Sequence, residues 1–515
     1  MNSGSMERVG TRGRGLRRGV RTIGWGVAAS AWFATATVMA GGSAIAGAAL
    51  PIAPPAVLPA ASPIASPIAP PVTPPGGATG TTGTNKTDPP DAGDTDTGPG
   101  TRAIAPAPVF DPVALFDGAH AEVGRLYPAF ELKGVDWDAV AAELRPAAEA
   151  AKSPADLGVV LQRMIARLKD ANATLGAGSE PAPDVGDDRP FGPGLECRFD
   201  ADGVFRVVRT VPGGAAQSEG LKPGDAILTI DGEPAKDAVA AFEREAADRR
   251  GFSTDHARRH AVIRGYFRTP EVAQWKSLTV DPAGPDPERE LDLFSMMIEP
   301  IVPAFSLPEG LNGPGGPTGP VAWAALGDSI GYLRITTIGD GLDGALDQAV
   351  NDLTQLPSLI VDLRGTGGDP FDPATAFLNF DAEGMGEGGI DGDEFDAPVR
   401  PIYDGTMILL VDAGTIGAGE TWLSWFAATR RARIMGSATA GAAARVKEVP
   451  LAGGRWIATI PTRHYRGFLG ADERIEGRGI IPDIVVEPTV EDLVEGRDGV
   501  LERAKQELDR VQSIG

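Results

Sequence analysis

Residues 411–422 read VDAGTIGAGETW, and the first of them, Val411, is the last residue of the apolar run Met407–Val411. Apolar residues recur at helical spacing after Glu420, so the stretch predicts a strand, a tight glycine turn and a helix. Many enzymes present a nucleophile at such a turn, because it exposes one side chain beside a helix N-terminus. Here that position falls on Gly417, which has no side chain.

The composition is that of a soluble globular protein, with 42% hydrophobic and 23% charged residues. The 515 residues are enough for several domains. A net charge of −23 argues against nucleic acid as a partner, because an acidic body repels it. The single cysteine, Cys197, excludes an intrachain disulfide and a thiolate metal cluster. The histidines are His120, His256, His260 and His464.

Residues 1–50 predict a targeting segment. Six arginines among residues 1–21 precede a Gly/Ala-rich apolar stretch, residues 23–50, which contains the small-residue cleavage pattern Ala44-Ile45-Ala46. We expect a signal peptide for export to the cell envelope, the periplasm or the medium. An uncleaved membrane tether through residues 23–50 is the alternative. Residues 51–102, rich in Pro, Gly and Thr, predict a disordered linker.

The rest of the chain predicts three folded parts. Residues 103–184 read as a helical domain, in which Ser153-Pro154 gives one helix a capping residue and a proline start. Residues 185–283 predict short strands and turns, and residues 284–515 predict an α/β core. Apolar runs in this core predict buried strands of a largely parallel sheet; they are Gly331–Ile335, Leu359–Leu363, Met407–Val411 and Arg433–Met435.

A G-x-S-x-G pattern at Gly327–Gly331 has to be weighed, since it occurs at nucleophile elbows. Such an elbow needs a strand before the serine and a helix after it. Here a predicted strand follows directly. We therefore interpret Ser329 as a residue of a hairpin turn.

Residues 185–283 contain an ordered series of motifs. Pro212–Ala216 predicts a short helix, Gly220–Asp225 a turn, and Ala226–Ile230 a strand that ends at Asp231-Gly232. The series resembles a bacterial PDZ domain. The resemblance implies that peptide C-termini bind by strand addition, with their carboxylate held by a loop. The corresponding loop residues are Gly192, Gly194 and Leu195.

Motifs along most of the remaining chain resemble one family. They are YPAFELKGVDWDA (127–139), LKDANATL (168–175), IGYLRI (330–335), LIVDLRGTGGD (359–369), GSATAG (436–441) and IEGRGIIPDIVV (475–486). Together with TIGAGE they are similar to tail-specific, or carboxy-terminal-processing, serine peptidases, a family that includes the tricorn core and the interphotoreceptor retinoid-binding proteins. The resemblance implies a multidomain α/β protein with a helical N-terminal piece, a PDZ domain and a crotonase-like α/β core.

The resemblance also implies that the catalytic groups are missing. Active relatives carry the nucleophilic serine where this chain has Gly417. Their base is a histidine at the position of Asn172 or a lysine at the position of Ala442. Glu476 resembles the acid that supports the histidine. The backbone positions resembling the oxyanion hole are Gly367, Gly368 and Ala418.

We therefore expect a pseudopeptidase that binds peptides or unfolded protein C-termini, without a cofactor or a metal. A working serine peptidase with a relocated nucleophile or base is an alternative, and a binder of small apolar ligands is another. Ser424 lies about two helical turns past Gly417, or ~10 Å, which is too far to replace it. We favour a surface or structural role for His464 over a relocated base. The pair His256 and His260 has too few partners for a metal site.

Overall fold

The computed structural model describes most of the chain from Phe110 onward. The described residues are 110–183, 191–297, 306–339, 342–368, 403–464 and 474–513. The predicted targeting segment, residues 1–50, and the predicted linker, residues 51–102, lie outside them. Among the described residues, no helix is both long enough and apolar enough to cross a membrane.

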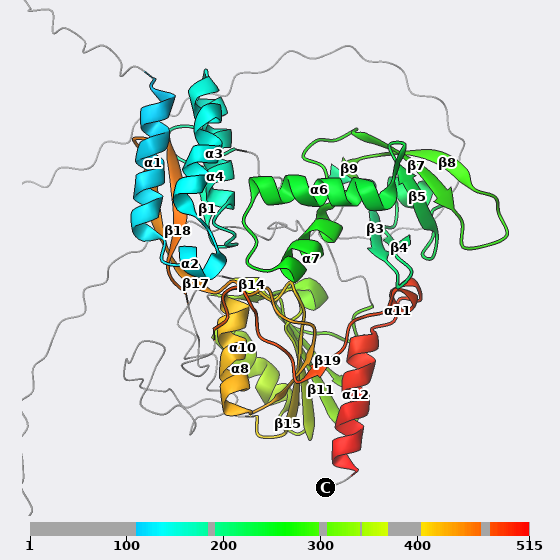
Figure 1. Ribbon diagram of the computed structural model, residues 1–515. Helices are drawn as coiled ribbons and strands as arrows, with labels where there is room; N and C mark the ends of the chain where they lie inside the picture. Colours follow the sequence, from blue (N-terminus) through cyan, green and yellow to red (C-terminus); the bar gives the residue numbers. More distant parts are fainter. Residues whose placement is uncertain are drawn as a thin grey trace, which may run out of the picture. The chain divides into compact units, whose positions relative to one another are not determined.

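The first elements of the described chain are four helices (Figure 1). They are α1 (Pro112–Leu126), α2 (Phe130–Lys133), α3 (Trp137–Ala150) and α4 (Pro154–Ala166). Helix α4 begins where the sequence predicts. The Ser153 hydroxyl accepts the Asp156 N–H, and the Asp156 carboxylate accepts the Ser153 N–H. This reciprocal cap satisfies N–H groups that have no partner within the helix.

A three-stranded antiparallel sheet joins these helices to the C-terminal part of the chain. Its order is β1 (Thr174–Ala177), β18 (Trp456–His464) and β17 (Ala444–Leu451). Buried side chains of α1, α3 and α4 share one hydrophobic core with those of β17 and β18, among them Leu451, Trp456 and Ile460. Segments near opposite ends of the described chain therefore build a single core.

The second part is a twisted antiparallel sheet with helices. Its strand order is β3 (Leu195–Phe199), β4 (Phe205–Thr210), β5 (Ala226–Ile230), β7 (Trp275–Asp281) and β8 (Arg289–Phe294), with β6 (Glu233–Pro234) beside β5. The helices are α5 (Ala215–Ser218), α6 (Ala235–Arg249) and α7 (Asp255–Gly265), and a separate pair joins β2 (Phe191–Gly192) to β9 (Met296–Met297). The short helix and the strand after the glycine turn are confirmed.

The α/β core is a six-stranded sheet. Its order is β10 (Val321–Leu326), β11 (Ile330–Ile335), β13 (Ser358–Asp362), β15 (Thr406–Val411), β16 (Arg433–Gly436) and β19 (Ile484–Val485). Only the β10–β11 pair is antiparallel among these neighbours. All four predicted core strands are confirmed. Ser329 lies in the turn between β10 and β11, which confirms the hairpin interpretation.

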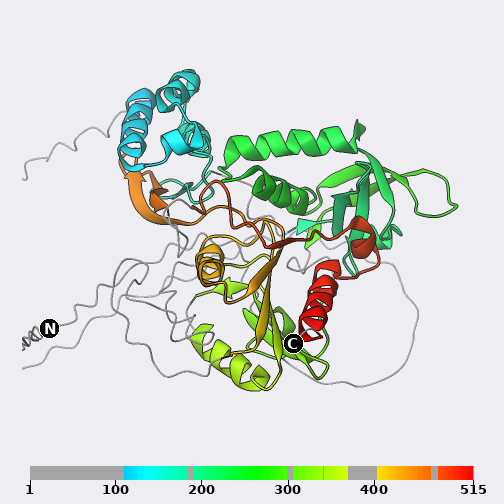
Figure 2. The same cartoon turned by 60° about the horizontal axis from the view of Figure 1, so that its bottom comes forward.

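Helices cover both faces of this sheet (Figures 1 and 2). Helices α8 (Leu342–Leu353) and α10 (Ala418–Thr429) pack on one face, against alternate residues such as Val361 and Leu409. Helix α12 (Gly499–Gln512) packs on the other, against Ile360, Ile408 and Leu410. Strands buried on both faces are read as continuous apolar runs. Smaller elements complete the described chain: η1 (Gly316–Thr318), β12 (Thr337–Ile338), β14 (Gly367–Gly368) and α11 (Val490–Val494).

We expect Trp456→Ala to lower the free energy of unfolding by about 3–5 kcal/mol, because it leaves a large cavity between α4 and β18. Trp456 is 1% exposed, its ring lies 3.0 Å from the position of a Cβ on Gly158, and its Nε1–H donates to the Pro181 carbonyl oxygen at 3.1 Å. Equilibrium unfolding in urea measures the change.

Trp275→Ala is the matched control, since Trp275 is 64% exposed and its removal should cost less than about 1 kcal/mol. Equal losses for the two variants would contradict a core shared by α4 and β18.

Candidate functional site

The predicted nucleophile position lies directly before helix α10. Gly417 caps this helix, and its backbone has φ +59° and ψ −112°. Side chains other than hydrogen are strained in this conformation. A Cβ built on Gly417 would have one neighbour within 4 Å among the described residues, the Ala442 carbonyl oxygen at 3.8 Å. The turn therefore has room for a side chain that the sequence does not supply.

A buried carboxylate holds the segments around Gly417 together. Glu420 is fully buried, and its Oε2 accepts the N–H groups of Gly417 at 3.2 Å and Ala442 at 2.8 Å. Its Oε1 accepts the Gly441 N–H at 2.6 Å and the Thr439 hydroxyl at 2.5 Å. One side chain thus fastens the turn before α10 to residues 439–442. We did not single out this residue in the sequence.

Burial raises the pKa of Glu420 from 4.5 to about 7. The four hydrogen bonds act in the opposite direction, because each donor stabilises the ionised carboxylate. Desolvation outweighs them. The carboxyl group therefore titrates close to neutral pH inside the folded protein.

The residues resembling an oxyanion hole lie on adjoining turns. The Ile416 N–H donates to the Thr366 carbonyl oxygen at 2.9 Å, which places the glycine turn after β13 against the start of α10. Ala418 is the first residue of α10, where N–H groups have no partner within the helix. Gly368 has φ +132°, and a Cβ there would lie 1.9 Å from a β12 carbonyl oxygen, so the position requires glycine. The Gly367 N–H faces the Thr336 carbonyl oxygen at 3.4 Å.

Neither predicted base position holds a base. Ala442 is fully buried, and its N–H is bonded to Glu420. Asn172 is half-buried, its N–H donates to Asp170 Oδ1 at 3.0 Å, and its buried Nδ2 has no hydrogen bond within the described residues. An amide cannot accept a proton from serine at neutral pH. No contact joins Asn172 to Glu476 among the described hydrogen bonds and ion pairs.

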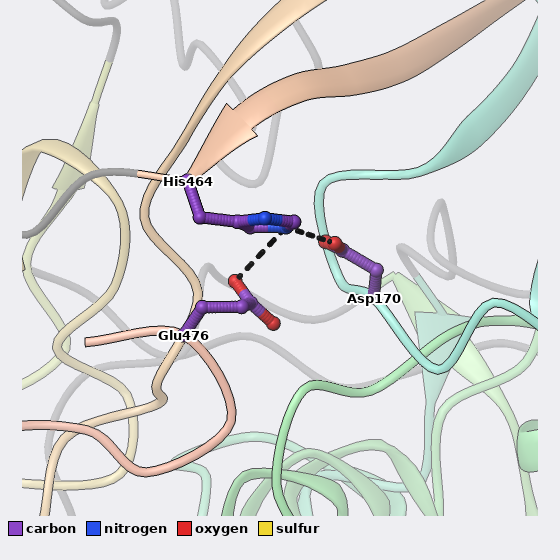
Figure 3. A group of neighbouring side chains, drawn as sticks. All are labelled: Asp170, His464 and Glu476. Atoms are coloured by element: carbon purple, nitrogen blue, oxygen red, sulfur yellow. Dashed lines mark hydrogen bonds and ion pairs between the residues drawn. The ribbon is translucent and has the colours of Figure 1, made fainter. Parts of the chain in front are cut away.

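Glu476 instead belongs to a buried polar cluster, in which it lies beside Asp170 and His464 (Figure 3). Its Oε1 accepts a hydrogen bond from the Lys133 ammonium group. His464, at the end of β18, places its Nε2 2.8 Å from Asp170 Oδ2 and 3.9 Å from Glu476 Oε2. The Tyr127 hydroxyl also donates to Asp170 Oδ2, at 3.1 Å. A carboxylate therefore holds the His464 ring.

The pKa values of the two carboxyl groups of the cluster are shifted in opposite directions. Burial and the nearby charge of Asp170 raise the pKa of Glu476 to about 7, although Lys133 and His464 oppose this shift. Burial would also raise the pKa of Asp170. The hydrogen bond from His464 and the charge of Lys133 outweigh it, so the pKa of Asp170 lies below its ordinary value.

The hydroxyl groups near the turn donate hydrogen bonds to backbone carbonyl oxygens. Thr415 donates its hydroxyl to the Leu363 carbonyl oxygen, Thr421 to that of Gly417, and Ser424 to that of Thr421. Cys197 is buried in β3, where burial raises the pKa of its thiol. Neither Thr415 nor Thr421 is bonded to a basic side chain among the described hydrogen bonds.

Helix α7 brings two histidines to the loops around Gly417. His256 Nε2 lies 2.6 Å from the Thr439 carbonyl oxygen. His260 Nε2 lies 3.0 Å from the position of a Cβ on Gly414, and burial lowers the pKa of this imidazole to about 4 despite the nearby Asp412. The rings contact different loops. Within the described residues, three or more converging metal-ligand side chains occur only at Asp170, His464 and Glu476.

The loop predicted to bind peptide carboxylates precedes the outermost strand of the second sheet. Gly192 pairs with Met296 in the β2–β9 ladder. Gly194 has φ +73° and lies against Val211. Leu195 begins β3, which is the first strand in the order β3-β4-β5-β7-β8. Helix α7 lies beside this strand.

Two known protein families match parts of the chain. Residues 329–486 match Peptidase family S41, and residues 114–166 match the tricorn protease C1 domain. The chain is 25% identical over 324 residues to the chloroplastic C-terminal processing peptidase of Tetradesmus obliquus, which covers 58% of this chain and 61% of that protein. It is 26% identical over 323 residues to the carboxy-terminal-processing protease of Bartonella bacilliformis, over 60% and 64% of the two chains. The match thus spans less than two thirds of either relative.

Solved structures share the fold. Mature CPAF is similar with a TM-score of 0.53 at 15% identity, over 74% of this chain and 95% of CPAF. The structure of CPAF complexed with lactacystin is similar with a TM-score of 0.53 at 16% identity, over 78% of this chain and 98% of that chain. At these identities the likeness concerns the fold alone. The two domain matches and the processing-peptidase relatives together support the tail-specific protease family for this chain.

The raised pKa of Glu420 predicts a pH dependence of stability. A carboxyl group whose pKa is higher in the folded protein contributes fully to stability below its unfolded pKa, and this contribution falls as the pH rises through the folded pKa. For Glu420, this contribution is lost between about pH 4.5 and about pH 7. Since glutamine does not titrate, the free energy of unfolding of Glu420→Gln relative to wild type should rise by up to ~3 kcal/mol across this pH range.

Urea unfolding of both proteins at pH 4.5, 5.5, 6.5 and 7.5 measures this difference. Glu448→Gln, on the exposed side of β17, is the control and should show a difference independent of pH. A difference for Glu420→Gln that stays flat or falls with pH would contradict a raised pKa.

Proposed function

We propose that this protein is a peptidase-fold protein that binds peptides or unfolded protein C-termini without cleaving them efficiently. The observation that carries the proposal is the turn at Gly417. Its backbone is shaped as a nucleophile turn before a helix, and Glu420 holds it in place, yet it carries no side chain. The scaffold for peptide chemistry is thus present without the group that attacks the peptide bond.

The absence of a base supports the same proposal. Asn172 and Ala442 cannot take up a proton, and Glu476 pairs with Lys133. Removing a member of a catalytic triad lowers kcat by several orders of magnitude, while oxyanion contacts alone leave a rate roughly 10³-fold over water. A remaining rate of that size is small compared with that of a working peptidase.

Peptide binding is proposed for the second sheet, which we interpret as a PDZ domain. Its strand order begins with β3, and β3 follows the loop that contains Gly192 and Gly194. A peptide added to an outer strand gains backbone hydrogen bonds, and loop N–H groups take its terminal carboxylate. Helix α7, beside β3, also reaches the loops around Gly417 through His256. A bound peptide would therefore lie near the turn that lacks the nucleophile.

We also propose that the protein acts outside the cytoplasm. Residues 1–50 have the composition of an export signal, and the similar proteins include a chloroplastic and a bacterial processing peptidase.

Cleavage of an unfolded protein, followed by mass spectrometry, tests the loss of chemistry. We expect no products from the natural protein. We expect Gly417→Ser with Asn172→His to raise the cleavage rate by a factor on the order of 10² or more, because it restores a nucleophile and a general base. Gly417→Ala with Asn172→His is the matched control, as it adds the same backbone strain without a hydroxyl. Efficient cleavage by the natural protein would contradict the proposal.

Fluorescence anisotropy with a labelled unfolded peptide tests binding. We expect amidation of the peptide C-terminus to weaken binding at least ~10-fold, since the loop N–H groups lose their carboxylate. Gly194→Ala should weaken binding as well, because a Cβ there lies 3.1 Å from the Val211 Cβ. Gly203→Ala has a similar positive φ but nothing within 4 Å, so it should bind like wild type. Equal affinity for both peptides would exclude terminal-carboxylate recognition.

A further inference from the structure

The cluster of Asp170, His464 and Glu476 has a donor set that the peptide-binding proposal does not use (Figure 3). Asp170 follows α4, His464 ends β18, and Glu476 lies in the segment after residue 474. One ligand atom from each residue lies within 4.8 Å of the other two. The two carboxylates are fully buried, and His464 is 13% exposed.

A buried carboxylate oxygen in this cluster lacks a hydrogen-bond partner. Glu476 Oε2 forms no hydrogen bond within the described residues, while it faces His464 Nε2 at 3.9 Å. Leaving a buried acceptor unsatisfied is costly, and more so for a charged group. A group that satisfies this oxygen would lie between the three side chains.

The surrounding groups orient these ligands. The Tyr127 hydroxyl and the Asn172 N–H donate to Asp170, and the Lys133 ammonium group donates to Glu476 Oε1. Carboxylates that bind metals are usually held by such outer hydrogen bonds. Lys133 occupies one oxygen of Glu476 and leaves the other free.

The charges of the cluster also favour a cation. Two carboxyl groups, Asp170 and Glu476, share this buried site with one ammonium group, Lys133. Any negative charge that the ammonium group does not balance is strongly disfavoured in a buried site. A proton on the cluster or a bound metal ion would compensate it.

We propose that Asp170, His464 and Glu476 bind one divalent first-row transition-metal ion, with Zn²⁺ as its representative. One imidazole nitrogen and two carboxylate oxygens are ligands that Zn²⁺ accepts, at about 2.0–2.2 Å each. For this geometry, the hydrogen bond between His464 Nε2 and Asp170 has to open, with the imidazole proton on Nδ1, and the Glu476 oxygen has to approach the imidazole. The ion would fasten the end of β18 to the segment after α4 and to the segment that carries Glu476.

Titration of the chelator-treated full-length protein with Zn²⁺, followed by calorimetry, tests the site. We expect one equivalent to bind, and His464→Gln to weaken binding at least ~100-fold. His120→Gln is the matched control, because its ring bonds the Trp137 carbonyl oxygen outside the cluster, and it should bind Zn²⁺ like wild type. Co²⁺ should give visible absorption bands that His464→Gln removes.

Lys133→Gln distinguishes a metal site from a site that holds only a proton. It removes a positive charge beside Glu476, so Zn²⁺ should bind this variant at least ~10-fold more tightly than wild type. Unaltered or weaker binding by this variant would overturn the proposal. So would the absence of Zn²⁺ binding by wild type, or binding that His464→Gln leaves unchanged, since a bridging proton would then be sufficient.

Discussion

The buried carboxylate of Glu420 is the interaction on which the candidate site depends. Its two oxygens accept hydrogen bonds from the turn before α10 and from residues 439–442. Without those bonds, the buried backbone N–H groups of Gly441 and Ala442 would lack partners, which costs free energy at each group. The carboxylate therefore maintains the shape of the turn before α10, although Gly417 carries no side chain.

The strands of the core sheet could be predicted because their own sequences are mainly apolar, which indicates burial on both faces. Met407–Val411 is apolar at every position, and Leu359–Leu363 is apolar except at the buried Asp362, as expected for strands covered on both faces. The Ser153 cap was predictable for a similar reason, because both of its partners lie within four residues. The core shared by α4 and β18 was not, since no local pattern states which distant strand will cover a helix.

The same difference between local motifs and contacts of distant segments applies to the candidate site. Gly417 and Ala442 could be singled out because each lies in a short motif with a recognisable spacing. Lys133, Asp170 and His464 could not be joined to Glu476 in advance, because they lie on separate segments and meet only after folding. The sequence around a histidine or lysine does not indicate which side chain it will contact. Glu420 was inside a quoted motif, yet only its complete burial shows that it organises the turn.

The core that α1, α3 and α4 share with β17 and β18 has a consequence for the order in which the chain folds. These helices are synthesised early, whereas Leu451, Trp456 and Ile460 follow only after most of the chain has been made. Until β17 and β18 have been made, the apolar faces of the helices stay exposed to solvent. Contacts between segments so distant in sequence also slow folding, and exposed apolar surface promotes aggregation. A nascent or truncated chain that ends before β17 would therefore be a natural substrate for chaperones.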